Sequence, residues 1–285
     1  MNINGTTKIY GLIGNPVAHT MSPLLHNTLA LKMGHNMVYT AFLVPDEKLS
    51  DAIRGAYALG IAGMNITAPY KSAVIPCLQF IDPLAEKIGG VNTLVRTSAG
   101  YIGYNTDYIG LYRAMQSEGM EICGSDILIF GAGPAARTAA FLCVDKGARR
   151  IFILNRSVDK AKNLAAFINK TMSTDALLGL SFNELSMLPE QNMIAIQGTS
   201  LGMSPHENEV LIENPDFYKR IKAGIDMIYN PKETLFMKNI RNAGGIAING
   251  LKMLLYQGIA AYEMWNEVTV PTEYIDFAYQ EVVSI

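Results

Sequence analysis

Lys71 stands out for its setting in the stretch GMNITAPYKSAV (63–74), which otherwise holds mostly small, apolar and hydroxyl-bearing residues. The nearest charged residues along the chain are Arg54 and Asp82. A lysine in such a run either lays its stem across an apolar surface with its ammonium in water, or it is a positioned chemical group. Desolvation favours the neutral amine, so the second interpretation makes Lys71 a candidate general acid or base.

A candidate partner is Asp107, which follows the second of two Asn-Thr pairs, at residues 92–93 and 105–106. Both pairs lie near apparent strand ends, where α/β proteins place binding groups along a crevice. If the segment NIT (65–67) converges with the second pair, Lys71 and Asp107 can pair over a small polar ligand. The carboxylate favours the charged amine and opposes desolvation, and the sequence leaves open which of the two moves the proton.

A second candidate site lies where Thr20 and Ser22 present hydroxyls just before Pro23, at the start of a predicted helix. Hydroxyl donors beside a helix N-terminus can bind an anion such as a carboxylate. Taken alone, the pattern is explained more simply by Ser22 as an N-cap and Thr20 as a turn residue. His19 and His26 flank this segment without a matched acid and nucleophile, and they are predicted to be structural.

A glycine-rich loop, GAGPAA (131–136), lies between an apolar predicted strand and a predicted helix. It is a variant of the G-x-G-x-x-A dinucleotide fingerprint, in which the glycines permit a tight turn and the close approach of a pyrophosphate. The alternative is a purely structural turn. The predicted cofactor-binding residues of this loop are Gly131, Ala132, Gly133, Pro134 and Ala135.

The end of the next predicted strand, LNRSVDK (154–160), bears on which dinucleotide binds. NAD-binding sites usually place an acidic residue there for the ribose hydroxyl, whereas an arginine accommodates the extra phosphate of NADP. Asn155 and Arg156 occupy this position, and Arg156, Ser157 and Lys160 can together hold a phosphate. NADP is therefore favoured over NAD, although Asp159 lies nearby and Arg156 could instead stack on an adenine.

The elements that must position these residues form two alternating series. Strands are expected at 8–14, 37–44 and 63–67 with helices between them, and a second series of strands and helices starts near residue 126. Such alternation predicts parallel sheets covered by helices. The predicted fold is two α/β domains with a cleft between them. Residues 1–107 and 251–285 form a substrate-binding domain with a parallel-rich sheet, and residues 108–250 form a Rossmann-like domain.

The composition limits the classes of function. The chain has 285 residues, 49% of them hydrophobic, and a net charge of -2, which gives no general attraction to nucleic acid or anionic membranes. Its start lacks the pattern of a signal peptide, and no apolar run is long enough for a membrane span. Cys77, Cys123 and Cys143 are far apart and form no zinc motif, so we expect buried thiols in a cytoplasmic protein without a metal site.

Several of these segments, in this order, resemble the shikimate dehydrogenase family, including its quinate/shikimate members. The motifs are GLIGNPVAHTMSPLLHN, GMNITAPYK, GGVNTLV, GYNTDYIG, FGAGPAARTA, LNRS, GTSLGM, DMIYNP and NGLKMLLYQG. The resemblance implies reversible, NADP-linked reduction of 3-dehydroshikimate to shikimate, a step of aromatic amino acid biosynthesis. In that reaction hydride reaches the ring ketone carbon while Lys71, oriented by Asp107, protonates the oxygen or donates a strong hydrogen bond to it.

The resemblance also implies roles for individual residues. Lys71 and Asp107 match the catalytic pair, and Thr20 and Ser22 match the hydroxyls that hold the substrate carboxylate. Tyr229 matches a tyrosine that borders this carboxylate. The residues that match groups for the ring hydroxyls are Asn65, Thr67, Asn92 and Gln257, and Thr199 matches a residue of a cofactor loop.

The sequence departs from the family pattern at a few positions. Thr20 replaces the usual serine, and its methyl group leaves the choice between shikimate and quinate open. Pro134 stands where many relatives have glycine, and Gln197 and Gly198 stand where relatives often have Asn and Ala.

Two other functions remain as alternatives: an NAD-linked quinate/shikimate dehydrogenase and a non-catalytic NADP-binding regulator. The expected partner is a small-molecule substrate, with the chain as a monomer or homodimer.

Overall fold

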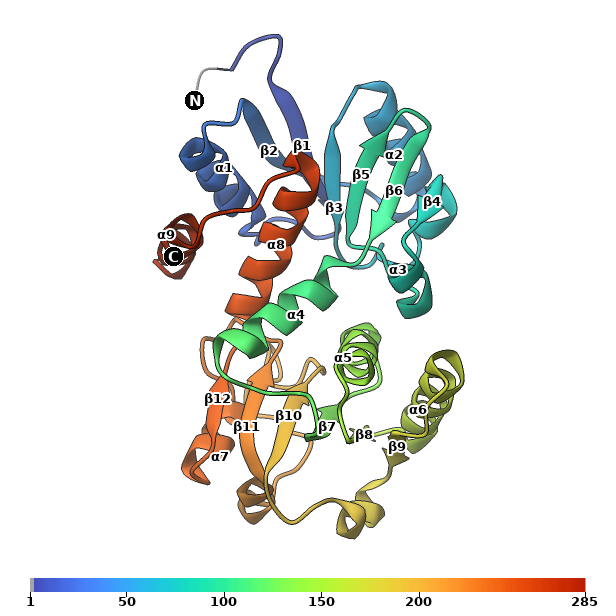
Figure 1. Ribbon diagram of the computed structural model, residues 1–285, viewed down its shortest axis with the longest axis vertical. Helices are drawn as coiled ribbons and strands as arrows, with labels where there is room; N and C mark the ends of the chain where they lie inside the picture. The colour runs from blue at the N-terminus through green and yellow to red at the C-terminus, as the bar shows by residue number, and fades with distance from the viewer. Residues whose placement is uncertain (1–2, 285) are drawn as a thin grey trace. The chain divides into compact units, whose positions relative to one another are not determined.

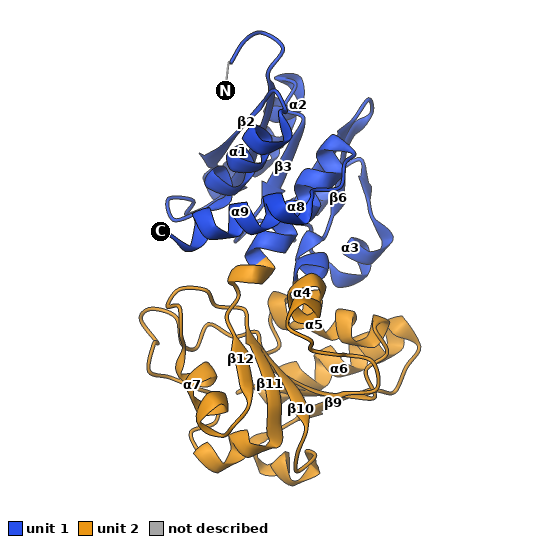
Figure 2. Ribbon diagram, turned by 60° about the vertical axis from the view of Figure 1, so that its left-hand side comes forward, with its two compact units in different colours: residues 1–110, 254–285 blue, residues 111–253 orange. Residues whose placement is uncertain are grey.

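The structure is a computed structural model that describes residues 3–284 (Figure 1). The chain divides into two compact units, Met1–Gly110 with Leu254–Ile285 and Leu111–Met253 (Figure 2). The divisions fall within helices α4 (Thr106–Ser117) and α8 (Leu251–Asn266). The fold is α/β, as predicted, with one mostly parallel sheet in each unit.

The sheet of the first unit has the strand order β2-β1-β3-β5-β6-β4. Its strands are β1 (Lys8–Gly14), β2 (Met37–Leu43), β3 (Gly63–Ile66), β4 (Phe80–Ile81), β5 (Thr93–Thr97) and β6 (Gly100–Tyr104). Strand β1 pairs in parallel with β2 and β3, whereas β5 is antiparallel to both of its neighbours. The reversed β5 therefore begins at the edge of the sheet where its neighbours β3 and β6 end.

The helices of the first unit follow the sequence signals closely. They are α1 (Ser22–Met33), α2 (Leu49–Ala58), α3 (Pro83–Ile88) and α9 (Thr272–Val283), with short 3-10 turns at Asp46–Lys48 and Ile75–Cys77. Helix α1 ends at Gly34, whose φ of 68° is the left-handed conformation that glycine adopts most easily. Helix α9 packs on α1 (Figure 1).

One local prediction for α1 is wrong. Met21, not Ser22, occupies the N-cap position, and Ser22 is already the first residue of the helix. Pro23 still lies in the first turn, where its missing N–H costs no helical hydrogen bond. The Ser22 hydroxyl is therefore not committed to capping the helix.

The sheet of the second unit is entirely parallel, in the order β12-β11-β10-β7-β8-β9. Its strands are β7 (Asp126–Phe130), β8 (Arg150–Leu154), β9 (Leu177–Leu180), β10 (Met193–Gln197), β11 (Ile221–Asp226) and β12 (Ile246–Ile248). Its helices are α5 (Pro134–Asp145), α6 (Val158–Met172) and α7 (Leu235–Asn242), with 3-10 turns at Phe182–Met187 and Pro215–Arg220. This is the doubly wound Rossmann order, which reverses between β7 and β10, the place where such folds bind dinucleotides.

The three cysteines are free thiols, and the expectation that all are buried is wrong. Cys143 is fully buried in α5, Cys77 is half-buried, and Cys123 is exposed because it lies in the connection that precedes β7. Among residues 3–284, no helix is both long and apolar enough to cross a membrane.

Candidate active site

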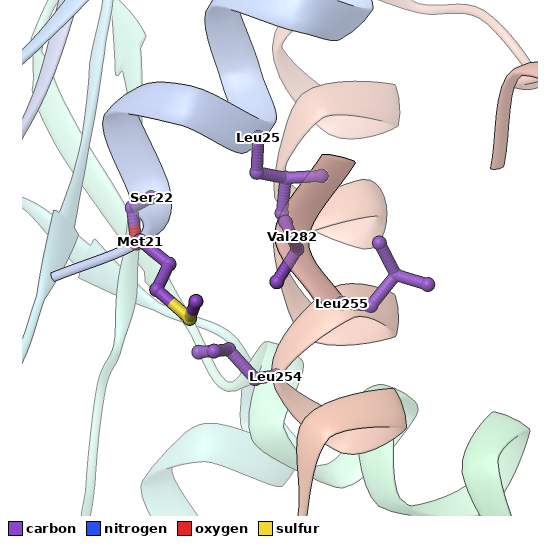
Figure 3. Close-up of a pocket in the computed structure, with 6 residues that line it drawn as sticks. All are labelled: Met21, Ser22, Leu25, Leu254, Leu255 and Val282. Atoms are coloured by element: carbon purple, nitrogen blue, oxygen red, sulfur yellow. The ribbon is translucent and has the colours of Figure 1, made fainter. Parts of the chain in front are cut away.

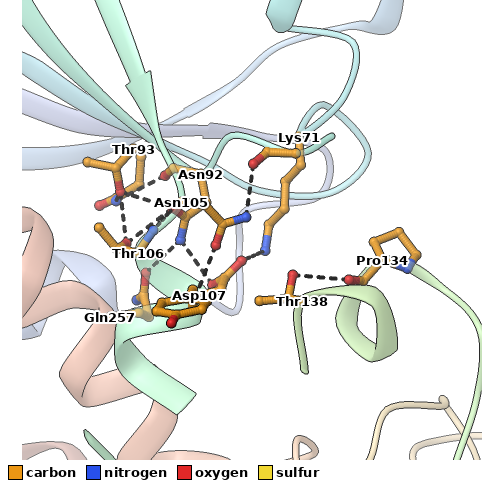
Figure 4. A network of polar contacts seen from close by, with 12 residues as sticks. Lys71, Asn92, Thr93, Asn105, Thr106, Asp107, Pro134, Thr138 and Gln257 are labelled. Carbon is orange, nitrogen blue, oxygen red and sulfur yellow. Dashed lines mark hydrogen bonds and ion pairs between the residues drawn. The ribbon is translucent and has the colours of Figure 1, made fainter. Parts of the chain in front are cut away.

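Lys71 and Asp107 form an ion pair in the first unit (Figure 4). Lys71 Nζ lies 2.6 Å from Asp107 Oδ2, and the two side chains are 35% and 16% exposed. Val91 N–H donates to the Lys71 carbonyl oxygen at 2.8 Å, which fixes the backbone of the lysine. Asp107 lies in the first turn of α4, where the helix dipole favours a negative charge. The ammonium of Lys71 therefore faces a carboxylate.

The two Asn-Thr pairs meet because β5 runs antiparallel. Residues 92–93 precede and begin β5, and residues 105–106 follow β6, so both pairs lie near a strand end, one at the start of its strand and the other after the end. Thr93 is paired with Asn65 on β3 and with Tyr104 on β6. The start of β5 thus lies beside the ends of β3 and β6 at one edge of the sheet. This arrangement brings together segments from three parts of the sequence.

Asn92 connects this edge to the ion pair. Its side chain is 2% exposed, and Nδ2 donates to Asp107 Oδ1 at 2.9 Å and to Gln257 Oε1 at 3.3 Å. Its Oδ1 accepts from the Thr106 backbone N–H at 2.7 Å (Figure 4). Asp107 therefore receives hydrogen bonds on both carboxylate oxygens, which hold it in a single orientation.

Asn65 extends the same network beneath the site. It is 4% exposed, and its Nδ2 donates to the Asn92 carbonyl at 3.2 Å and to Thr93 Oγ1 at 3.1 Å. Its Oδ1 accepts from the hydroxyl of Tyr39 at 2.7 Å. Thr67 follows Asn65 by two residues, past the end of β3, and is half-buried. The chain thus places amide, carboxylate and ammonium groups together, a set suited to a small polyhydroxylated ligand and a proton transfer.

The sequence motifs pointed to some members of this network and missed others. Thr93, Asn105 and Thr106 were visible in the Asn-Thr pairs, but no role was assigned to them. Asn105 accepts from the Tyr108 N–H at 3.1 Å and so caps α4 beside Asp107. Tyr39 carried no signal, because a tyrosine within an apolar strand looks like an ordinary core residue.

Thr20 and Ser22 lie together at the start of α1. Thr20 Oγ1 donates to Ser22 Oγ at 3.2 Å and accepts from the Ser22 backbone N–H at 3.3 Å. Ser22 also borders a pocket whose other lining residues are apolar (Figure 3). These are Met21 and Leu25 of the α1 region, Leu254 and Leu255 of α8, and Val282 of α9. The pair of hydroxyls thus lies beside an apolar wall built by the C-terminal helices.

The flanking histidines have different environments. His19 is exposed, whereas His26 is fully buried. Burial lowers the pKa of His26 to about 3, so its ring is neutral at physiological pH. Its ring stacks on Tyr39 with centroids 4.2 Å apart. His26 is thus a neutral packing group in the core of the first unit.

The glycine loop of the second unit makes a tight turn and leaves the N-terminus of α5 open. Gly131 has a φ of 104°, and a Cβ atom there would lie 2.9 Å from Thr199 Cγ2. Gly133 is the N-cap of α5, and a Cβ atom at this position would meet open space. Pro134 begins the helix, and Ala132 and Ala135 complete the loop. The loop therefore leaves room for a phosphate at the helix N-terminus.

Thr199 lies on the neighbouring loop after β10. Gln197 is 1% exposed. Its Oε1 accepts from the Thr199 hydroxyl at 3.1 Å and from the Thr199 backbone N–H at 3.3 Å. A Cβ atom on Gly198 would lie 3.0 Å from the backbone N of Ala136. The departures at 197 and 198 are thus accommodated: the glutamine shapes the loop, and the glycine permits close packing against α5.

The residues after β8 are accessible. Arg156, Ser157 and Lys160 are exposed, and Ser157 is the N-cap of α6. Asn155 Nδ2 donates to the Ser157 carbonyl at 2.9 Å, which shapes the turn into the helix. A basic side chain, a hydroxyl and a helix N-terminus are therefore available to a phosphate at this position.

A buried carboxylate supports the loop that carries Tyr229. Asp226 ends β11, is 0% exposed, and accepts from the Thr234 hydroxyl at 2.6 Å and the Ile228 N–H at 2.9 Å. Burial raises the pKa of Asp226 to about 6, and these hydrogen bonds limit the rise. Tyr229 lies in the second unit, where it is half-buried, and burial raises its pKa.

Comparisons with known proteins match most of the chain. Residues 12–94 match the model of the shikimate dehydrogenase substrate binding domain, and residues 114–208 match the shikimate / quinate 5-dehydrogenase model. Residues 250–276 match the shikimate 5'-dehydrogenase C-terminal domain. A shikimate dehydrogenase (NADP(+)) of Bacillus cereus strain G9842 is 42% identical over 260 residues, which cover 91% of this chain and 92% of that protein.

Solved structures give the same result. A crystal structure of a shikimate dehydrogenase in complex with NADP+ is 37% identical with a TM-score of 0.88, covering 98% of this chain and 97% of that one. The enzyme of Listeria monocytogenes, in complex with shikimate and NAD, is 32% identical with a TM-score of 0.89, covering 97% and 98%.

Proposed function

The chain belongs to the shikimate dehydrogenase family, and we propose that it catalyses the reversible NADP-dependent reduction of 3-dehydroshikimate to shikimate. The observation that carries this proposal is the ion pair between Lys71 and Asp107. Asp107 Oδ2 lies 2.6 Å from the Lys71 ammonium, and Asp107 Oδ1 lies 2.9 Å from Asn92 Nδ2. A non-catalytic binding protein needs polar groups for its ligand, but it has no need of a positioned proton donor.

The first unit would bind substrate and the second NADP. Gly131 and Gly133 would admit the pyrophosphate to the N-terminus of α5, and Arg156 with Ser157 would hold the additional phosphate of NADP. Ala132, Pro134, Ala135 and Thr199 would shape the loops around it, with Asn155 and Lys160 beside the phosphate. NADP, when bound, supplies or accepts the hydride.

The chain's own contribution to chemistry is proton transfer and charge stabilisation at the ketone oxygen. The Lys71 ammonium would meet the negative charge that develops there and supply a proton, a contribution of about 10²–10⁴-fold for a positioned acid. Asp107 holds the ammonium, and Asn92 holds Asp107. In shikimate oxidation the hydroxyl proton would pass to the same pair, either to Lys71 in its neutral amine form or to the Asp107 carboxylate.

Substrate binding divides between a carboxylate site and a hydroxyl site. Thr20 and Ser22 would hold the carboxylate with neutral donors, with Tyr229 bordering it. The apolar wall next to Ser22 would face the ring carbons. The proposed ligands of the ring hydroxyls are Asn65, Thr67, Asn92 and Gln257.

The direct test is to follow the absorbance of the reduced nicotinamide while the purified protein oxidises shikimate or quinate with NADP or NAD. We expect shikimate with NADP to give the fastest turnover. Preference for quinate with NAD would assign the protein to the quinate branch, and shikimate binding without turnover in any combination would indicate a regulator.

The cofactor preference depends on Arg156. Replacing it with alanine removes a charge-assisted contact, so the KM for NADP should rise about 10- to 100-fold while that for NAD stays unchanged. Lys222→Ala, at an exposed position on β11, is the matched loss of a cation and should change neither KM. An equal effect of Arg156→Ala on both cofactors would contradict the assignment. The cytoplasmic location and the monomer or homodimer state stay predictions.

A further inference from the structure

Tyr39 lies in the middle of β2 and is held in place from two sides. Its backbone N–H donates to Asn27 Oδ1 at 2.9 Å, and its carbonyl accepts from Asn27 Nδ2 at 2.9 Å. Its ring stacks on His26 with an interplanar angle of 18°. The two residues that fix it are adjacent on α1, in the helix that begins with Ser22. Tyr39 is only 2% exposed, so its ring has little freedom to move.

The phenol of Tyr39 reaches across one strand to the site. Strand β1 lies between β2 and β3, and the Tyr39 hydroxyl donates to Asn65 Oδ1 on β3 at 2.7 Å. Burial raises the pKa of Tyr39, so the phenol stays protonated and acts as a donor throughout the physiological range. The amide oxygen of Asn65 therefore always receives a hydrogen bond from behind the site.

The hydrogen-bonding capacity of Asn65 is then almost fully used. An asparagine side chain has two N–H donors and two acceptor sites on its oxygen. Both donors are used, by the Asn92 carbonyl at 3.2 Å and by Thr93 Oγ1 at 3.1 Å. Tyr39 uses one acceptor site. What remains is one lone pair on Oδ1, and the buried ring of His26 also faces this amide. A substrate hydroxyl that binds Asn65 must therefore donate its proton to Oδ1.

We propose that Tyr39 is a positioning residue that holds the Asn65 amide so that its oxygen faces the substrate as a hydrogen-bond acceptor. This inference rests on the proposed function, since it takes Asn65 as a ligand of a substrate ring hydroxyl. In this role Tyr39 would act through Asn65, to which its hydroxyl donates, and not by contact with substrate. The Tyr39 hydroxyl also lies near the Ser22 hydroxyl. His26 contributes by stacking on the tyrosine ring as a neutral, fully buried surface.

The test removes only the phenol oxygen. In Tyr39→Phe the stack on His26 persists, but Oδ1 of Asn65 loses the hydrogen bond that fixes it, and only the two bonds made by Nδ2 still hold the amide. The KM for shikimate should rise about two- to tenfold, the size expected for one misdirected neutral hydrogen bond, while the KM for NADP stays unchanged. Tyr101→Phe is the matched control: Tyr101 is also 2% exposed in the first unit, and its hydroxyl donates to the Ile61 carbonyl at 2.7 Å, outside the network.

A double variant separates positioning from general loss of stability. If Tyr39 acts through Asn65, then Tyr39→Phe adds nothing to the KM of Asn65→Ala. Independent, multiplying effects of the two substitutions would overturn the proposal. So would a shikimate KM in Tyr39→Phe equal to that in Tyr101→Phe, because both variants lose one buried hydrogen bond of the same kind.

Calorimetric titration of each variant with shikimate distinguishes a failure of the proposed function from a failure of the positioning role of Tyr39. If the unmodified protein neither binds nor oxidises shikimate, the proposed function fails, and the role of Tyr39 fails with it. If the unmodified protein binds and oxidises shikimate but Tyr39→Phe binds it equally well, only the positioning role is wrong. A weaker affinity in Tyr39→Phe, with Tyr101→Phe unaffected, supports both.

Discussion

The two units present their candidate binding residues in opposite ways. In the first unit, Asn65 and Asn92 are 4% and 2% exposed and belong to a continuous hydrogen-bond network that ends at Asp107. In the second unit, Arg156 is exposed and Gly133 borders open space. The first site is built from buried side chains, and the second from backbone and accessible charge.

The difference follows from what each site has to bind. Ring hydroxyls are neutral and differ only in position, so a site that distinguishes them needs donors and acceptors fixed in advance. A phosphate carries a charge that helix N-termini and arginine attract without a rigid network. Discrimination among polyhydroxylated ring acids should therefore depend on buried residues of the first unit. Cofactor affinity should depend on the open turns of the second unit.

The largest expected effect comes from Lys71→Ala, which removes the proton donor but leaves Asn65 and Asn92 bonded as they are. Turnover of shikimate should fall about 10²–10⁴-fold, with a much smaller change in KM. Steady-state kinetics with saturating NADP measures both. Lys48→Ala, which removes a lysine whose side chain is 61% exposed in the same unit, should leave both constants unchanged. Unchanged turnover in Lys71→Ala would show that Lys71 does not take part in the chemistry.

The same contrast explains which parts of the fold and of the two sites could be predicted from the sequence alone. The glycine loop is a local motif, so its strand, turn and helix could be predicted from adjacent residues, and the α/β class followed from alternation. The hydrogen-bond network could not, because it depends on the reversed strand β5, which brings Thr93 beside Asn65. The short turn at residues 98–99 indicates that β5 and β6 are antiparallel, but it does not show that β5 pairs with β3. Tyr39 was missed for the same reason, since its partner lies 26 residues away, across another strand.

Two glycines of the same loop, Gly131 and Gly133, allow the backbone site to be tested separately for folding and binding. Gly131→Ala places a side chain at a φ of 104° and 2.9 Å from Thr199 Cγ2, so the free energy of unfolding should fall by about 2 kcal/mol. Gly133→Ala adds a methyl group to open space, at a φ of -86° that any residue adopts. Its stability should stay unchanged, whereas its KM for NADP should rise about tenfold or more, because the methyl group occupies the space that the pyrophosphate needs.

Thermal unfolding and NADP titration of both variants check this pair. Each variant is the control of the other, since both add one methyl group to the same loop. Equal NADP affinity in Gly133→Ala and the unmodified protein would mean that no phosphate approaches this backbone. The second unit would then bind its ligand through side chains, and the contrast between the two units would disappear.

The smallest expected effect concerns Asp226, the buried carboxylate that supports the loop of Tyr229 in the second unit. Because burial raises its pKa to about 6 in the folded state from 3.8, the folded protein takes up a proton before the unfolded chain does. The stability contributed by this group therefore increases as the pH falls from 7 toward 4, by about 1 kcal/mol between pH 7 and pH 5. Urea unfolding of the unmodified protein and of Asp226→Asn at both pH values isolates this contribution as the difference between the two proteins.

Asp126 is a second buried aspartate of the same unit, and its titration must not overlap with that of Asp226 in this experiment. Burial by itself raises the pKa of Asp126, but hydrogen bonds and charges from Arg150 and Arg149 outweigh it and hold the pKa at about 2. Its stabilisation is present above about pH 4 and is lost only as the pH falls toward 2, outside the window of the experiment. An identical change in the free energy of unfolding for Asp226→Asn and the unmodified protein would show that Asp226 is ionised as easily as an exposed carboxylate. The loop that carries Tyr229 would then be accessible to water, like the other binding elements of its unit.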